Sequence, residues 1–455
     1  MVAIVRMPSV ERRKTIGASP GQNGAKGEPP VTFMDDHHAS LHSRTVDPDT
    51  AQCGVVREWL TSRPEALFDE LREHAPTLVI GRMAFVTSFA DVLDVLGRDD
   101  VFSVRPYGEA IMRINRGPNF LLGMDDGPEY QQQLSLLRGV FHREDVGRIR
   151  AIINAHASEA LAPSLAAGRL DVVDGFGRLV AARVVGEYFG VPGPDAATLM
   201  QWARAIFTDG FANVLQLPLL SRRAMRASAA FRSYLDELVA GVKSDRADGA
   251  PTRDDVLGRL LTRQPAVEPE LTDAQIRDNL LWCVAGMIDN VNTAVCHVLD
   301  HLLEHPEVMA GASDAARAGD MELLHAYALE ALRFRTPTPV VTRVSLREHT
   351  LSRGTPHEKT IPEGTLTFLG IGAAMKDGMA IDEPKAFRLD RPSHHYLHFG
   401  AGLHRCLGIH IAEAHATEMV GRLLTLPGLT RARGAAGRLR RIGPFPQKFV
   451  VEFEP

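Results

Sequence analysis

Apolar residues recur at helical spacing along most of this chain, and short strand-like runs are confined to a few places. The first clear helical pattern begins at Arg63 in RPEALFDELREHA, and TLVI and MAFV then predict two short strands around Gly81 and Arg82. Helical segments dominate to about residue 335, after which strand-like runs return in VVTRVSL, GTLTFLGIG and KFVVEFE. The segment RPYGEAIMRINRGPNF, residues 105–120, is predicted to be a loop. We therefore predict a mainly α fold with a small β portion.

The first 50 residues differ from the rest. Residues 1–50 are polar and rich in Gly, Pro, Ser and charge, as in SPGQNGAKGEPP, and they lack periodicity. Such a composition predicts a mobile tail. Beyond it, no composition shift marks a linker and no internal repeat is present, although 455 residues would suffice for two or three domains of ordinary size. We predict one large α domain over residues 51–455.

The charge balance limits the possible partners. The chain has 51 basic and 56 acidic residues and a net charge of −5, which gives no general attraction to phosphate backbones. We therefore expect no nucleic-acid partner. No apolar run approaches the ~18 residues of a membrane span, and the first residues lack the pattern of an export signal. These features predict a cytoplasmic protein without a membrane anchor.

Four cysteines are too few and too scattered for a disulfide framework. Cys283 and Cys296 are predicted to share one helix, which separates them by ~20 Å at ~1.5 Å per residue. Because that distance exceeds disulfide reach, both are interpreted as small buried hydrophobes.

Cys406 stands in the stretch HHYLHFGAGLHRCLG and admits three interpretations. It could be a buried structural cysteine, which is the commonest role of a lone thiol. It could bind zinc together with the nearby histidines, although their spacing matches no paired-ligand pattern. It could also supply a single thiolate to haem iron. The nearby histidines are His394, His395, His398 and His404.

The haem interpretation has local physical support. The following segment, IHIAEAHATEMVGRLLTL, is predicted to be an amphipathic helix, so Cys406 would lie near its N-terminus, where the helix dipole lowers a thiol pKa. Gly400 and Gly402 would let the backbone approach a flat macrocycle, and backbone amides could donate to the sulfur. His404 could reach a haem propionate.

FGAGLHRCLG also resembles the haem-binding signature of the cytochrome P450 family, Phe-Gly-x-Gly-x-(His or Arg)-x-Cys-x-Gly. A cysteine thiolate on haem iron favours cleavage of the O–O bond, a role for which this family is the standard example. Every fixed position of the signature is met. These positions are Phe399, Gly400, Gly402, His404, Cys406 and Gly408.

The segment ALEALRFRTP resembles a second family signature, Glu-x-x-Arg. Its Glu330 and Arg333 share a helix face upstream of Cys406. By resemblance, Arg391 in DEPKAFRLDRP completes a structural network with this pair. Arg343 in VVTRVSL stands where relatives bind a haem propionate. Taken alone, Glu-x-x-Arg is weak, because exposed pairs with this spacing are common.

The helix that crosses the haem in relatives carries an acid and an alcohol that deliver protons during dioxygen activation. In VAGMIDNVNT the preferred alignment puts Asp289 at the acid and Asn290 at the alcohol, so the threonine is absent. A register that starts from Gly286, an expected cofactor-binding residue, would instead put Ile288 and Asp289 there. A third possibility is that Asp289 and Asn290 face solvent.

A second departure from the family pattern lies in GPEYQQQLSLLRGVF. Tyr130 replaces the usual histidine and Leu134 the usual arginine, so other groups must neutralise the propionates. Tyr130 can still donate a hydrogen bond. The neighbouring glutamines could equally form an ordinary exposed helix face. The further candidates for the propionates are Arg343, His404, His395 and Arg138.

The resemblance implies a monooxygenase with haem b that inserts one oxygen atom of O2 into a C–H bond of a mid-sized, mostly apolar substrate, in secondary metabolism. Electrons would come from a separate ferredoxin system or flavodoxin, for which Arg138, Arg143 and Arg405 could form a docking patch. Arg113 or Arg116 could face a polar group of the substrate. Two alternatives remain: a relative driven by peroxide, by substrate-assisted protonation or by oxidative coupling, and a non-catalytic haem sensor.

Overall fold

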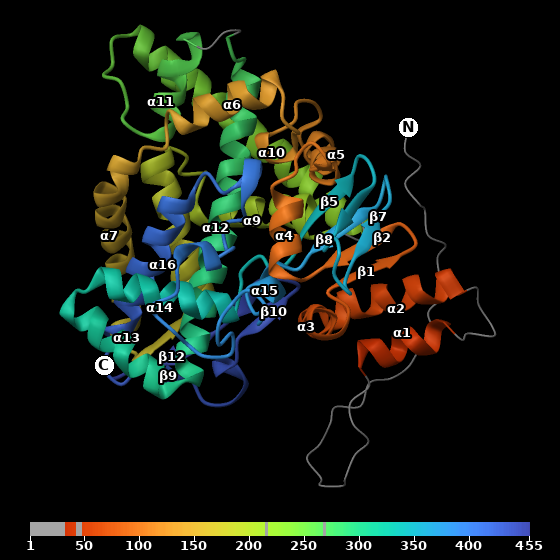
Figure 1. Ribbon diagram of the computed structural model, residues 1–455. Helices are drawn as coiled ribbons and strands as arrows, with labels where there is room; N and C mark the ends of the chain where they lie inside the picture. Colours follow the sequence, from red (N-terminus) through yellow and green to blue (C-terminus); the bar gives the residue numbers. More distant parts are fainter. Residues whose placement is uncertain (1–31, 42–47, 214–216, 267–269) are drawn as a thin grey trace.

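The computed structural model describes residues 32–41, 48–213, 217–266 and 270–455, and Figure 1 follows the chain through them. Helices form most of the fold, and the strands form small sheets, so the predicted mainly α class is confirmed. The helices are α1 Phe33–Leu41, α2 Pro48–Ser62, α3 Pro64–His74, α4 Phe89–Leu96, α5 Arg105–Asn115, α6 Pro128–Arg138, α7 Val146–Leu165, α8 Arg178–Val184, α9 Ala196–Phe207, α10 Pro218–Ala247, α11 Val256–Arg263, α12 Asp273–Glu304, α13 Pro306–Ala318, α14 Met321–Phe334, α15 Ile371–Ala374 and α16 Ile409–Leu424.

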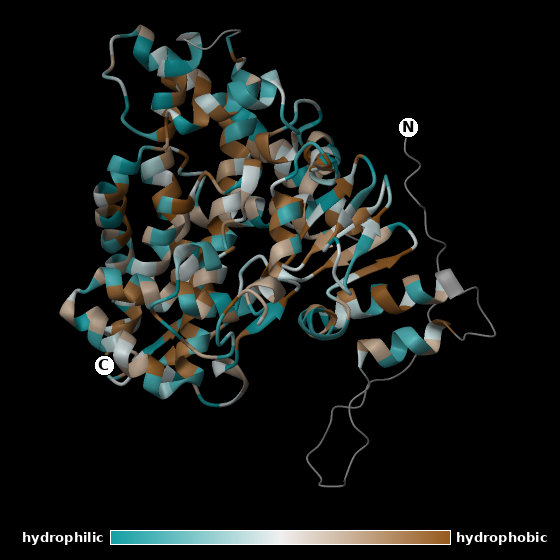
Figure 2. Cartoon of the chain, viewed as in Figure 1, coloured by the Kyte–Doolittle hydropathy of each residue, from teal (hydrophilic) through white to brown (hydrophobic). Residues whose placement is uncertain are grey.

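The largest sheet has five strands in the order β1-β2-β8-β5-β3. Only the β2–β8 pair is parallel, and the other neighbours in this sheet are antiparallel. Its inner strands appear brown in Figure 2 because they are rich in apolar residues. The strands are β1 Thr77–Ile80, β2 Met83–Val86, β3 Phe102–Ser103, β4 Arg169–Asp171, β5 Val341–Ser345, β6 His349–Leu351, β7 Lys359–Ile361, β8 Leu366–Leu369, β9 Thr430–Arg431, β10 Arg440–Ile442, β11 Phe445–Lys448 and β12 Val450–Glu452.

Helix α12 is the central element of the helical core. It begins with a capping box, in which the Thr272 side chain accepts from the backbone of Gln275 and the Gln275 side chain accepts from the backbone of Thr272. It then runs for 32 residues and packs against α8, α9, α10, α14 and α16. Because it is surrounded by helices, almost every residue from Ile276 to Leu302 is buried. This helix and α16 hold the two parts of the candidate site.

Two segments that were predicted to be irregular are helical. The expected loop at residues 105–120 contains α5, which starts with Pro106 in its first turn, where a proline costs no hydrogen bond. Gly108 is needed there because a β-carbon would lie 2.4 Å from the carbonyl oxygen of Gly123. Within the expected tail, residues 33–41 form α1, whose Phe33 is fully buried against Trp59. Residues 48–50 of the expected tail begin α2, and residues 1–31 and 42–47 lie outside the described residues.

Candidate functional site

Cys406 lies at the end of a tight loop that leads into α16. Its backbone N–H donates to the carbonyl of Phe399 over 2.9 Å, which closes the loop. Gly400 and Gly402 adopt φ values of +68° and +70°, a left-handed conformation that residues with a side chain rarely adopt. Gly408 is the N-cap of α16, so Cys406 is two residues from a helix N-terminus.

Gly402 is required by a close backbone contact. A β-carbon on Gly402 would lie 2.1 Å from the carbonyl oxygen of Leu96, the last residue of α4. The sequence suggested that this glycine admits a flat ligand, but the close approach in the structure is to α4. Gly402 therefore fixes the loop of Cys406 against the sheet side of the fold.

We expect Gly402→Ala to lower the free energy of unfolding by about 2–4 kcal/mol, because strain at positive φ adds to the clash with Leu96. Gly400→Ala is the matched control: its φ has the same sign, but its β-carbon would meet only the His404 carbonyl oxygen at 3.9 Å. Chemical denaturation of both variants measures the difference. Equal losses would show that the contact with Leu96 is unimportant.

The thiol of Cys406 is embedded in protein yet presents free surface. Burial raises its pKa, and the backbone N–H of Gly408 and the charge of Arg405 oppose that rise only in part. The prediction that the helix terminus lowers the pKa of this thiol is therefore wrong for the protein groups alone. The residue nevertheless counts as exposed. The raised pKa and the exposed surface are both explained if the sulfur faces an internal space in the protein, which we call the hollow.

One face of α12 lies toward Cys406 and would form the opposite wall of this hollow. Within a helix that is otherwise buried from Ile276 to Leu302, the half-buried positions follow helical spacing and form a single stripe. Cys283 lies in this stripe close enough to Cys406 for the two thiols to interact electrostatically, and burial followed by this neighbour raises the pKa of Cys283 to about 12. The stripe consists of Cys283, Gly286, Met287, Asn290 and Ala294.

Gly286 and Asn290 lie within this stripe. A β-carbon on Gly286 would meet no atom within 4 Å, so nothing else in the described protein packs on this point of the helix. The Asn290 side-chain amide donates to the Gly286 carbonyl over 2.7 Å. This bond uses one amide proton and leaves the Asn290 carbonyl oxygen and a second proton free.

Asp289 points to the other side of the helix. It is fully buried and accepts two hydrogen bonds of 2.6 Å from Arg204 on α9. Arg178 at the start of α8 adds an ion pair at 3.2 Å. The possibility that Asp289 faces solvent is therefore wrong. The structure does not bring its carboxylate together with Asn290 in the stripe, and its role in proton delivery stays a prediction.

Arg343 and His404 are two neighbouring polar groups that lack an acidic partner among the described residues. Arg343 on β5 is 6% exposed, and among the described residues its only side-chain hydrogen bond goes to the Thr342 carbonyl. The buried Nδ1 atom of His404 has no partner in the described protein. Burial, and then the charge of Arg343, lower the pKa of His404 to about 4. A buried guanidinium without a carboxylate is costly, so these groups fit an anionic ligand such as a haem propionate.

Tyr130 supports His404 from α6. Its hydroxyl donates to the Leu403 carbonyl over 2.8 Å, and its ring packs edge-on against the His404 ring at 5.4 Å between centroids. The Tyr130 hydroxyl proton is therefore already used in a hydrogen bond to the protein backbone. Another buried polar group of α6 is Gln133, which is 1% exposed and, among the described residues, has no partner for either amide atom. The interpretation of the glutamines as an exposed face is wrong for Gln133.

The other two propionate candidates are less closely tied to this pair. His395 packs edge-on against Phe89 of α4, and its buried Nδ1 atom has no partner among the described residues. Arg138 is exposed at the end of α6, where its charge acts on Tyr130. The structure therefore brings Arg343 and His404 together, and the roles of His395 and Arg138 stay predictions.

Glu330, Arg333 and Arg391 form a buried ion network. Glu330 binds Arg333 through both carboxylate oxygens, at 2.8 and 3.0 Å, and Arg391 through one, at 3.0 Å. Burial acts to raise the pKa of Glu330, but the bonds from Arg333 and Arg391 outweigh it and lower the pKa. The arginines also donate to carbonyls between residues 375 and 386, which ties α14 to the segment before the Cys406 loop. The possibility of a solvated pair is therefore wrong.

The histidines near Cys406 point to different partners. His398 bonds to the Leu329 carbonyl at 3.0 Å, and His404 packs against Tyr130. In the part of the chain that the structure describes, no three side chains of the metal-binding types come together. The zinc interpretation of this stretch therefore has no geometric support.

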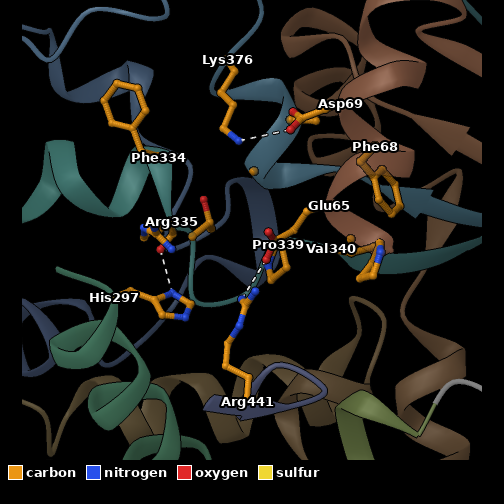
Figure 3. Close-up of a pocket in the computed structure, with 14 residues that line it drawn as sticks. Glu65, Phe68, Asp69, His297, Phe334, Arg335, Pro339, Val340, Lys376 and Arg441 are labelled. Atoms are coloured by element: carbon orange, nitrogen blue, oxygen red, sulfur yellow. Dashed lines mark hydrogen bonds and ion pairs between the residues drawn. The ribbon is translucent and has the colours of Figure 1, made fainter. Parts of the chain in front are cut away.

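A separate small cavity lies between α3, the loop after α14, α15 and β10, and Figure 3 shows the residues around it. Its volume is about 70 Å³, which accommodates roughly five water molecules and excludes a mid-sized substrate. His297 of α12 lines it and is bonded to the Arg335 carbonyl at 2.9 Å. The ion pair between Arg441 and Glu65 crosses it at 2.8 Å. Cys406 is not among the residues that line this cavity.

Comparison with known proteins agrees with this geometry. The sequence model of the family "Cytochrome P450" matches residues 82–426. Pulcherriminic acid synthase of Bacillus subtilis (strain 168) is 24% identical over 382 residues, covering 81% of this chain and 89% of the relative. Cytochrome P450 107B1 of Saccharopolyspora erythraea is 29% identical over 311 residues, covering 68% and 69%.

The fold of this chain is also similar to that of a solved structure. The crystal structure of P450BioI in complex with a hexadec-9Z-enoic acid ligated acyl carrier protein superimposes with a TM-score of 0.74 at 21% identity, covering 87% of this chain and 99% of that one. The chain belongs to the cytochrome P450 family and is a haem-dependent monooxygenase. Members use an organic substrate, O2 and a redox partner. Among the described residues, none of the helices has the length and apolar character that crossing a bilayer requires.

Proposed function

We propose that this protein inserts one oxygen atom of O2 into a C–H bond of a mid-sized, mostly apolar organic substrate in secondary metabolism. Cys406 would bind the iron of haem b. The observation that carries the proposal is the stripe of half-buried residues on α12, one of which, Cys283, interacts electrostatically with the exposed Cys406. A flat macrocycle would lie between the stripe and the sulfur of Cys406.

Haem bound through a thiolate supplies activation of O2 and cleavage of the O–O bond. The residues of this chain would position it. The charge of Arg343 would neutralise a propionate, the neutral His404 would donate a hydrogen bond, and Tyr130 would hold the His404 ring in place. Gly286 would leave room for O2 above the macrocycle, because it adds no side chain to the wall.

Asn290 is the residue of the stripe most suited to hold water near the reacting oxygen. Its amide donates to the Gly286 carbonyl, and its free carbonyl oxygen can accept from a water molecule. Unlike a hydroxyl, an amide cannot rotate one proton between donor and acceptor roles, so the proton would come from that water. Asp289 would act indirectly, because Arg178 and Arg204 hold its carboxylate on the opposite face.

We expect Asn290→Thr to change the coupling of electron consumption to product by about 3-fold or more, or to change the product, because a hydroxyl restores a rotatable proton relay. Comparing product formed with hydrogen peroxide released measures the coupling. The matched control is Asn292→Thr, two residues along α12 on its buried side. Identical coupling and products in Asn290→Thr and the unsubstituted protein would exclude a catalytic role for this position.

The absence of a hydroxyl at Asn290 favours one alternative function. The chain could use peroxide directly, take protons from a substrate hydroxyl or carboxylate, or catalyse oxidative coupling. Product formation from hydrogen peroxide without an electron donor distinguishes this alternative. A non-catalytic haem sensor, the other alternative, is excluded by turnover of any organic compound with reduced redox partner.

Electrons would come from a ferredoxin or flavodoxin in the cytoplasm. Arg143 and Arg405 both act electrostatically on Glu413 of α16, so they lie on the Cys406 side of the molecule. A surface hollow of about 290 Å³ beside them is lined by Arg143, His410 and Glu413, among others. Arg138 would extend this basic surface. An acidic redox protein fits it by charge.

The substrate could be carried on a protein, as in the neighbouring structure that contains an acyl carrier protein. The function is tested by screening organic compounds, free and tethered to a carrier, for displacement of water from the ferric haem. Hits are then incubated with ¹⁸O2 and a reduced ferredoxin. We expect one ¹⁸O atom in the product. A product whose inserted oxygen carries no ¹⁸O would overturn the proposal.

A further inference from the structure

The first half of α10 is strongly basic in a chain whose net charge is −5. Residues 218–233 include four arginines and no acid. Arg222, Arg223 and Arg226 are exposed, and none of them is paired with an acid in the part of the chain that the structure describes. Their spacing of three and four residues places them on one helix face.

A neighbouring helix extends this surface. The Ser228 hydroxyl of α10 donates to the carbonyl of Ile114 near the end of α5 over 2.9 Å, so the two helices meet there. Arg116, the C-cap of α5, is exposed and lies close enough to Arg232 to act on it electrostatically. Among the described residues, Arg116 has no acidic partner.

An acid beside this surface, Asp209, is already neutralised. Asp209 is 3% exposed, and it binds Arg113 at 3.0 Å and the Ser221 hydroxyl at 2.7 Å. Two large apolar side chains are exposed beside the arginines: Leu217 is 49% and Leu219 is 53% exposed. We define the roof patch as Leu217, Leu219, Arg222, Arg223, Arg226 and Arg116.

The roof patch lies on a helix that contacts the proposed site through α12. Helix α10 packs against α9 and α12, and α12 packs against α16, which follows the Cys406 loop (Figure 1). A protein bound on α10 would therefore lie next to the helix that carries the stripe of the proposed substrate pocket.

The geometry points to a docking site for an acidic carrier domain that holds the substrate on a phosphopantetheine arm. This inference rests on the proposed function. Four unpaired guanidiniums would face the carboxylates of an acidic helix, and Leu217 and Leu219 would contact its apolar residues. The arm could then enter the pocket beneath α10.

Other acidic or anionic partners fit less well. An electron donor at the roof patch would be separated from Cys406 by α9, α10 and α12. A bilayer would need a long apolar helix face, but Leu219 is the one large apolar residue of α10 that is strongly exposed among the described residues, and others such as Phe231 and Leu235 are buried in the core. Duplex DNA is bound through many more cations than the patch offers.

The test uses the haem-loaded protein and a bacterial acyl carrier protein bearing a hexadecenoyl chain and a fluorophore on its surface. Fluorescence anisotropy should show binding that weakens as salt is raised. We expect R222E/R223E/R226E to weaken binding at least ~30-fold, because three attractions become repulsions. The matched control R353E/R433E/R438E changes the net charge equally at exposed positions outside the patch, and binding should change less than ~3-fold.

Absence of binding to the unsubstituted protein at low salt would overturn the inference, as would equal losses in the two triple variants. Binding to vesicles of phosphatidylcholine and phosphatidylserine that is lost only in R222E/R223E/R226E would also overturn it, in favour of a membrane surface. The carbon monoxide spectrum of each variant separates this inference from the proposed function. An unchanged spectrum with lost carrier binding supports the roof patch, whereas a spectrum without the thiolate signature in all proteins contradicts the proposed function.

Discussion

Glu330→Ala should lower the free energy of unfolding by about 3–5 kcal/mol. The substitution leaves Arg333 and Arg391 buried without the carboxylate that both contact. Arg333 is fully buried, so water cannot replace the lost partner without opening the core. Denaturation followed by circular dichroism measures the loss, and haem retention should fall with it because the network holds the segment before the Cys406 loop.

The control for this prediction has the same spacing on the surface. Asp314 and Arg317 of α13 also form an i,i+3 pair, at 3.0 Å, but both side chains are more than half exposed. Asp314→Ala should cost no more than about 1 kcal/mol, because solvent screens the pair. A loss of that small size in Glu330→Ala would show that the buried network contributes little.

Cys406→Ser should reduce turnover of any identified substrate more than ~100-fold. Residues that only orient a metal ligand typically contribute 10–100-fold, and Cys406 is proposed to be the ligand itself. A serine hydroxyl is a poor donor to haem iron and does not provide the electron density of a thiolate. Turnover is measured with the haem content of each preparation known, so that loss of cofactor is separated from loss of chemistry.

Cys53→Ser on α2 serves as the control for the thiol substitution, because Cys53 lies outside the hollow. It should leave turnover within ~2-fold of the unsubstituted protein. Turnover by haem-loaded Cys406→Ser at the unsubstituted rate would show that another residue binds the iron.

The parts of the site that could be predicted are local in sequence. The Cys406 loop compresses its fixed residues into ten positions, and Glu330 and Arg333 share one helix turn, so their arrangement follows from spacing. Arg391 was predicted by resemblance, and the structure places it on the same carboxylate.

The parts that could not be predicted depend on packing between distant segments. Asp289 is held by Arg178 and Arg204, which lie 111 and 85 residues away along the chain, and no local pattern indicates that pairing. Gln133 looks like one of three equivalent polar residues, but packing buries it. The segment that forms helix α5 was predicted to be a loop; its proline, Pro106, lies in the first turn, where a helix tolerates it.

The most direct test of the account is the absorption spectrum of the reduced, haem-loaded protein with carbon monoxide. If the sulfur of Cys406 binds the iron as an anion, the Soret band of the adduct will show the strong red shift that a thiolate imposes, and Cys406→Ser will lose that shift. A protein that fails to take up haem, or an adduct with the unshifted band of neutral ligands, would contradict the account.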